Sequence, residues 1–238
     1  MRRLNDPERV RLEYATEDGL LARASIYEGV SGPDAREAAF QAVREAAPRR
    51  VLEVGCGWGE FAERMLVELG VDVVAVDLSP RMVELARERG VDARIGDVEA
   101  LPFEDESFDV TVANWMLYHV PDLEQAISEL ARVTRRGGRL VAATNSLDHL
   151  GELWSLVGRD RHWEPERFFS EDAGARLRQC FTSVERLDVT GSVTFADREA
   201  VRGYIASSVA HKHLADLVPE LSDPLVATRR NAIFVAHK

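Results

Sequence analysis

This chain of 238 residues has only two cysteines, no excess of positive charge and no long apolar run. The two cysteines, Cys56 and Cys180, form no paired C-x-x-C spacing, so the sequence indicates neither a zinc site nor a disulfide framework, and we expect no metal. The longest apolar runs have the length of strands, and the basic N-terminus lacks the apolar segment of a signal peptide. These absences predict no membrane span and a cytoplasmic protein.

The charge balance is acidic, with 41 Asp and Glu against 30 Lys and Arg, a net charge of −11. Proteins that bind nucleic acids usually carry a basic footprint, so we expect no nucleic-acid partner. The same balance disfavours anionic membrane surfaces. Hydrophobic residues make up 45% of the chain, enough for a large core, and the length fits one domain over residues 1–238.

Strand-like and helix-like segments alternate from residue 51 onward. Alternation of this kind predicts a parallel sheet with helices on both faces, and strands buried on both faces read as near-continuous apolar runs. The expected strands are 50–54, 71–77, 92–96, 108–114 and 139–144, followed by 182–190 and 231–238. We expect only helices in residues 1–50, and further helices at 171–180 and 197–222.

Capping residues place the helix boundaries. Ser79 reads as an N-cap before Pro80, and Asp122 caps a helix with Gln125 at the capping-box position. Gly70 is expected to end the first helix after the sheet begins, and the pair Gly137-Gly138 to end the helix that Asp122 starts.

A glycine-rich turn and an acidic residue point to a ligand. The first strand ends in Gly55-Cys56-Gly57-Trp58-Gly59, where glycine permits a sharp turn and close approach of a ligand to the backbone. Ligands of open α/β sheets bind beyond the carboxyl ends of the strands. Asp77 ends the next strand, about 20 residues later, where a carboxylate can bind ribose hydroxyls. A plain tight turn and a helix-cap aspartate are the alternatives. Together the two features predict a nucleoside-containing cofactor, either NAD or S-adenosylmethionine.

Glu60 favours S-adenosylmethionine over NAD as the cofactor. A dinucleotide turn G-x-G-x-x-G/A that starts at Gly55 requires glycine or alanine at position 60, where this chain has glutamate. A carboxylate there would repel a pyrophosphate, whereas the sulfonium of S-adenosylmethionine is positively charged and carries no phosphate.

Four segments in order resemble a known family. They are VLEVGCGWG, VVAVDLSPRMVELAR, IGDVEALPFEDESFDVTVAN and YHVPDLEQAISELARVTRRGGRLV. Over residues 48–145 the chain resembles the class I S-adenosylmethionine-dependent methyltransferases, in the small-molecule branch that includes ubiquinone- and menaquinone-biosynthesis enzymes. The resemblance implies a Rossmann-like, doubly wound, seven-stranded sheet that is mostly parallel with an antiparallel C-terminal strand. It also implies a helical lid over residues 1–47 and acceptor-side insertions with closing strands over residues 146–238.

The same resemblance implies roles for single residues around S-adenosylmethionine. It assigns the ribose to Asp77 and the methionine amino group to the backbone carbonyl of Asn114. Other residues are expected beside the methionine (Glu53, Gly55, Cys56, Gly57), the adenine (Leu78, Met82, Gly96, Asp97, Val98) and the methyl group (Trp115, Met116). Trp58 departs from the family pattern, in which a small residue or proline stands between these glycines.

The acceptor and the lid are less well specified by the sequence. Tyr14 and Arg23 are candidate lid residues that could also belong to a solvated helix face; an arginine suits the methionine carboxylate because its fork binds both oxygens. Methyl transfer from a sulfonium needs chiefly positioning, and a base only for a weakly acidic hydroxyl or protonated amine. His149 and His119 are base candidates. His162 and His211 are further candidates, because they lie in segments that could cover the active site.

We therefore expect methyl transfer by in-line displacement to an oxygen, nitrogen or carbon of a small molecule. An NAD-dependent oxidoreductase and a non-catalytic S-adenosylmethionine-binding module are the alternatives. An aromatic group is expected either to line the acceptor pocket or to form a satellite core: Trp154, Trp163, Phe168 and Phe169. Residues 1–30, 145–169 and 197–222 are expected to cover the carboxyl ends of the strands.

Overall fold

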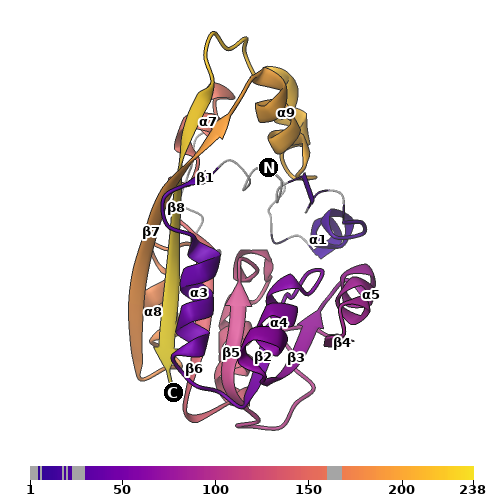
Figure 1. Cartoon of the computed structure of the whole chain (residues 1–238), viewed down its shortest axis with the longest axis vertical. Helices are drawn as coiled ribbons and strands as arrows, with labels where there is room; N and C mark the ends of the chain where they lie inside the picture. The colour runs from indigo at the N-terminus through magenta and orange to yellow at the C-terminus, as the bar shows by residue number, and fades with distance from the viewer. Residues whose placement is uncertain (1–4, 6, 18, 20, 23–29, 160–167) are drawn as a thin grey trace.

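The computed structural model describes residues 5, 7–17, 19, 21–22, 30–159 and 168–238. Within them one eight-stranded sheet has the strand order β1-β7-β8-β6-β5-β2-β3-β4 (Figure 1). The strands are β1 (Val30–Ser31), β2 (Arg50–Val54), β3 (Asp72–Asp77), β4 (Asp92–Ile95), β5 (Phe108–Asn114), β6 (Thr134–Asn145), β7 (Ser183–Phe195) and β8 (Leu225–His237). Strands β2 to β6 pair in parallel, and β8 is antiparallel to both of its neighbours. The Rossmann-like sheet with an antiparallel C-terminal strand is confirmed.

Helices cover both faces of this sheet. They are α1 (Pro7–Glu13), α3 (Ala35–Arg44), α4 (Glu60–Arg64), α5 (Pro80–Glu88), α6 (Leu123–Val133), α7 (Gly151–Leu156), α8 (Ala173–Leu177) and α9 (Arg198–Ala206). A π-helical turn η2 (Met65–Leu69) continues α4, and the 3₁₀ turns are η3 (Leu117–His119) and η4 (Lys212–Leu217). Helices α3, α4 and α5 pack against one face, and α6 and α8 against the other.

Each strand contributes alternate side chains to two hydrophobic cores, one on each face of the sheet. On β2, Val51 packs with α3, α4 and α5, whereas Leu52 and Val54 pack on the opposite face with α6 and α8. Successive strand residues point to opposite faces, so a strand covered on both sides must be apolar throughout. The predicted caps are confirmed, because Ser79 accepts from the Met82 amide and Asp122 from the Gln125 amide.

Three expectations about the strands were wrong. The sheet has eight strands rather than seven, because β1 at Val30–Ser31 adds a short edge strand within the segment expected to hold only helices. Gly137-Gly138 does not end α6: that helix ends at Val133, and the glycines lie inside β6. Pairing between Phe108 of β5 and Thr134 starts β6 early, with a register shift before the regular ladder.

The third error concerns length, since β7 and β8 extend well past 182–190 and 231–238. Their long hairpin rises beyond the other strands and carries α7 and α9 (Figure 1). A third hydrophobic cluster, which includes Leu153, Phe195 and Ile205, holds these elements together. We call β1, α7, α9, η4 and this part of the hairpin the cap. None of the described helices is long and apolar enough to cross a membrane.

Candidate active site

A cavity of about 810 Å³ lies at the carboxyl ends of the parallel strands, and its wall includes residues of α1 and of the cap. Parallel sheets of this topology place their ligands at this end. The cavity brings together most of the residues that the sequence singled out: Tyr14, Glu53, Gly55, Cys56, Gly57, Asp77, Leu78, Gly96, Asp97, Val98, Asn114, Trp115, Met116, His119 and His149.

Some candidates do not reach this wall. Met82 is fully buried but is not one of the lining residues. Trp154 belongs to the core of the cap, where its ring centroid lies 5.0 Å from that of His211, and Phe168 belongs to the main core. The satellite-core interpretation therefore holds for Trp154, whereas Phe168 fits neither alternative. Arg23, His162 and Trp163 lie outside the described residues.

The glycine turn is shaped by close packing. Gly55 and Gly57 have φ angles of 64° and 54°, in the left-handed region that favours glycine. A Cβ atom on Gly55 would lie 2.6 Å from Cβ of Met116, so no other residue fits there without displacing the segment that follows β5. The turn is tied to β3 by Asp77, whose Oδ2 accepts from the Gly57 amide at 2.9 Å while Oδ1 accepts from the Ser79 amide at 2.9 Å. Asp77 thus serves as a turn residue and also lines the cavity.

Buried polar groups without partners surround this turn. Glu53 is only 3% exposed, and burial, followed by the nearby Asp77 carboxylate, raises the pKa of its carboxyl well above the usual value. Within the described part of the chain, Glu53 Oε2 and both amide atoms of Asn114 are buried without a hydrogen-bond partner. Such groups are costly unless a ligand or water satisfies them. Their donors and acceptors fit the ammonium and carboxylate of an α-amino acid.

The segment that contains α1 bridges the two sides of the cavity. The Tyr14 carbonyl accepts from Ser79 Oγ at 2.7 Å, and the Tyr14 hydroxyl lies 2.9 Å from Nε2 of His119. On the other side Glu13 Oε2 accepts from the Val209 amide at 2.7 Å, just after α9. Residues around α1 therefore contact both the cofactor side of the sheet and the cap.

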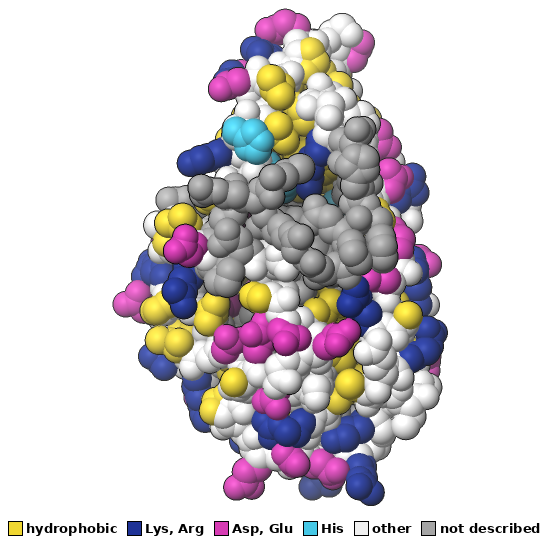
Figure 2. All heavy atoms as spheres, turned by 180° about the vertical axis from the view of Figure 1, so that it is seen from behind, with side chains coloured by type: hydrophobic (Ala, Val, Ile, Leu, Met, Phe, Trp, Pro, Cys, Tyr) yellow, Lys and Arg dark blue, Asp and Glu magenta, His cyan; other side chains and the backbone are white. Residues whose placement is uncertain are grey.

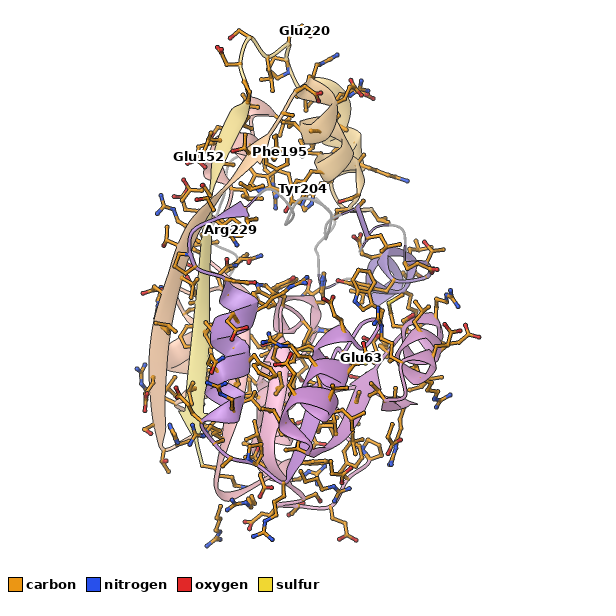
Figure 3. All side chains as sticks on the ribbon, viewed as in Figure 1. Glu63, Glu152, Phe195, Tyr204, Glu220 and Arg229 are labelled. Carbon is orange, nitrogen blue, oxygen red and sulfur yellow. The ribbon has the colours of Figure 1, made fainter. Side chains whose placement is uncertain are left out.

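The cavity wall also includes four residues that the sequence analysis missed. Asn145 ends β6, and Asn231 lies on β8. Tyr204 lies on α9 and Arg229 on β8 (Figure 3). Asn145 could have been found, because it ends a parallel strand as Asn114 does. Arg229 and Asn231 carry no such signal, since β8 runs antiparallel and brings its first half, rather than its end, to this place.

His149 is the better buried of the two base candidates, with 5% of its surface exposed. Its Nδ1 lies 3.1 Å from both the amide nitrogen and the carbonyl oxygen of Arg230, so the β8 backbone can hold either tautomer of the ring. A ring held in this way has a defined orientation at the cavity wall, which is what a proton acceptor requires.

The surface seen from behind is mixed in charge. Figure 2 shows acidic and basic side chains interspersed over the lower half of this face, with hydrophobic side chains between them. The acidic net charge of the whole chain and this mixed face give no support to a basic binding surface.

Comparisons with known proteins agree on one family. A family described as a methyltransferase domain matches residues 52–142. An uncharacterized methyltransferase of Mycobacterium bovis is 38% identical over 176 residues, which cover 69% of either protein. The malonyl-[acyl-carrier protein] O-methyltransferase of Yersinia pestis is 40% identical over 117 residues, 47% of this chain and 43% of that protein. The match thus spans less than half the length of that relative.

A solved structure extends the similarity to most of the fold. A SAM-dependent methyltransferase of Thermotoga maritima superposes with a TM-score of 0.55 and 27% identity, covering 86% of this chain and 90% of that protein. The similarity thus extends beyond residues 52–142.

Proposed function

Because this chain belongs to the class I S-adenosylmethionine-dependent methyltransferases, we propose that it methylates an oxygen, nitrogen or carbon atom of a small molecule in the cavity described above. The observation that carries the proposal is the set of partnerless buried atoms of Glu53 and Asn114 beside the glycine turn. The resemblance of the sequence to the family implies that these residues would hold the methionine part of the cofactor.

The residues present fit that cofactor. Glu53 and Asn114 would hold the amino-acid end, Asp77 the ribose hydroxyls, and Leu78, Asp97 and Val98 the adenine, all from the cavity wall. When bound, S-adenosylmethionine supplies a methyl group already activated on a sulfonium. The chain's own contribution is to orient the acceptor and exclude water around it.

A proton acceptor would come from one of two histidines in the wall. His149 is oriented by the Arg230 backbone, and His119 is in hydrogen-bond reach of the Tyr14 hydroxyl. His149 is our first choice because it lies on the acceptor side, with Asn145 and Asn231. In the tautomer whose Nδ1–H donates to the Arg230 carbonyl, its Nε2 carries the lone pair that a base needs.

We also propose that the cap, with the segment around α1 and the stretch that includes His149, covers the bound substrates. Tyr14, His149 and Tyr204 come from these three parts of the chain, and all line the cavity. A cover of this kind must open for product release.

The NAD-dependent alternative receives no support from the site. Glu60 begins α4 at the cavity wall, where its carboxylate accepts from Trp58 Nε1 at 3.1 Å and lies 3.7 Å from Arg36 Nη1. A dinucleotide would bring its pyrophosphate to this helix start, against that carboxylate.

The test is transfer of a labelled methyl group from S-adenosylmethionine to a panel of phenols, quinols, amines and carboxylic acids. Gly55→Ala should abolish transfer, because its Cβ would collide with Met116, whereas Gly203→Ala has no atom near the added Cβ and should leave transfer unchanged. Binding of the cofactor without transfer to any acceptor would favour a non-catalytic binding module.

A further inference from the structure

Two asparagines and a tryptophan form a hydrogen-bonded group in the cavity wall. Asn145 and Asn231 are paired in the register of β6 and β8, and Trp115 directly follows β5. Oδ1 of Asn145 accepts two hydrogen bonds, from Trp115 Nε1 at 3.1 Å and from Asn231 Nδ2 at 2.7 Å. All three residues line the cavity.

Chemistry fixes the orientation of both amides. An indole N–H can only donate, so the Asn145 atom that faces Trp115 must be the carbonyl oxygen. That oxygen can only accept, so the Asn231 atom that faces it must be the NH₂ group. The remaining atoms of the group are therefore a donor, Asn145 Nδ2, and an acceptor, Asn231 Oδ1.

These two atoms are open to the cavity. Within the described part of the chain neither atom makes a hydrogen bond, and neither is as fully buried as the unpartnered atoms of Glu53, Asn114 and Arg202. Asn231 as a whole is only 6% exposed. A buried amide whose oxygen is accessible from a ligand cavity is a group that a ligand can satisfy.

The backbone of Trp115 is held in an uncommon conformation at this point. Its φ angle is 51°, in the left-handed region that non-glycine residues rarely adopt, and its amide donates to the Ala143 carbonyl at 2.8 Å. Strain of this kind persists where the surrounding structure over-determines it, often at ligand sites. Here it accompanies the hydrogen bond that orients Asn145.

We propose that Asn145 and Asn231 select an acceptor that presents a neutral hydroxyl group to this wall. A hydroxyl can accept from Asn145 Nδ2 and donate to Asn231 Oδ1 at the same time. The pair therefore acts as a specificity determinant of the methyl-transfer site, and this inference rests on the methyl-transfer function proposed above.

Other groups satisfy only one half of the pair. A carboxylate accepts from Asn145 but places its lone pairs against Asn231 Oδ1, and a methoxy group accepts without donating. An ammonium has the opposite fault, because it donates to Asn231 but cannot accept from Asn145. Sites built to bind a hydroxyl reject analogues that lack it, because their own buried polar groups are then left unpaired.

The experiment measures binding of small probes to the full chain saturated with S-adenosylhomocysteine. The probes are phenol, anisole, benzoate and benzylamine, each of which presents a single polar group on a benzene ring. We expect phenol to bind about tenfold more tightly than anisole or benzoate. Equal binding of the four probes, binding of none of them, or a preference for benzoate would overturn the proposal; the last would point to an anion site at Arg229 instead.

Asn145→Asp is the diagnostic variant, because its carboxylate can still accept from Trp115 and Asn231 while the donor becomes an acceptor. We expect weaker phenol binding and tighter binding of benzylamine; unchanged selectivity contradicts the assignment. Asn231→Leu should remove the preference for phenol, and a thermal melt with S-adenosylhomocysteine shows that each variant is folded. Failure of S-adenosylhomocysteine to bind the unaltered chain would instead count against the proposed function itself.

Discussion

Replacing Asp77 tests the ribose assignment. Each oxygen of its carboxylate accepts one backbone amide, from Gly57 and from Ser79, and each can still accept from a ligand hydroxyl. Asp77→Ala removes both acceptors, whereas Asp77→Asn keeps one carbonyl oxygen. Loss of a hydrogen bond to a charged group costs about 1.5–3 kcal/mol, so the alanine variant should bind S-adenosylhomocysteine about 10- to 100-fold more weakly. The asparagine variant should fall between it and the unaltered chain.

Titration calorimetry with S-adenosylhomocysteine is the assay, and Asp72→Ala is the matched control. Asp72 starts the same strand at its opposite end and pairs with Arg50 at 3.3 Å, away from the cavity wall. Because Asp77 also holds the glycine turn, the thermal midpoint of each apo variant must be measured as well. Unaltered affinity in the alanine variant, or an equal loss in Asp72→Ala, would refute the reasoning.

Three further changes test other parts of the site. Burial raises the Glu53 pKa, so the folded state binds a proton at this carboxyl more tightly than the unfolded chain does. The folded state therefore loses stability as pH rises above 4.5. In thermal melts without cofactor, the stability of Glu53→Gln relative to the unaltered chain should increase from about pH 5 to about pH 8. His149→Gln should lower kcat about 10²- to 10⁴-fold without changing cofactor affinity if His149 is the base, whereas the exposed His213→Gln should change neither. Arg81 lowers the Glu17 pKa to about 2, so this ion pair is present above the unfolded pKa and lost only as pH falls through about 2. Glu17→Gln should therefore speed hydrogen exchange around α1 at neutral pH, and its difference from the unaltered chain should shrink as pH falls through about 2.

Local signals predicted the cofactor side of the molecule well. Strands β2, β3 and β5 follow from apolar runs, and the caps at Ser79 and Asp122 depend on neighbouring residues only. The site on this side forms because parallel strands bring their carboxyl ends to one edge, so Asp77 and Asn114 could be placed together from the sequence.

The cap and acceptor side could not be predicted in the same way. The first half of β8 contains Arg229 and Arg230, and it is a strand because it pairs with β7 far along the chain. The start of β6 is also set by tertiary contacts: Thr134 Oγ1 lies 2.9 Å from Thr111 Oγ1 and donates to the Leu130 carbonyl at 2.6 Å. Long-range pairing therefore makes the first half of β8 and the start of β6 strands, although their local sequences favour turns.

The same cause explains why Asn231 was missed. Its position opposite Asn145 exists only in the antiparallel register of β6 and β8. Nothing in the sequence near Asn231 distinguishes it from other polar residues at the start of an apolar run, and the hydrogen bond to Asn145 becomes visible only in the folded chain.

Calorimetric titration of the purified chain with S-adenosylhomocysteine, alongside NADH under the same conditions, tests the central claim most directly. The account predicts saturable binding of S-adenosylhomocysteine at one site per chain. It predicts no heat of saturable binding with NADH, because the Glu60 carboxylate stands where the pyrophosphate would lie. Saturable binding of NADH together with no heat from millimolar S-adenosylhomocysteine would contradict it.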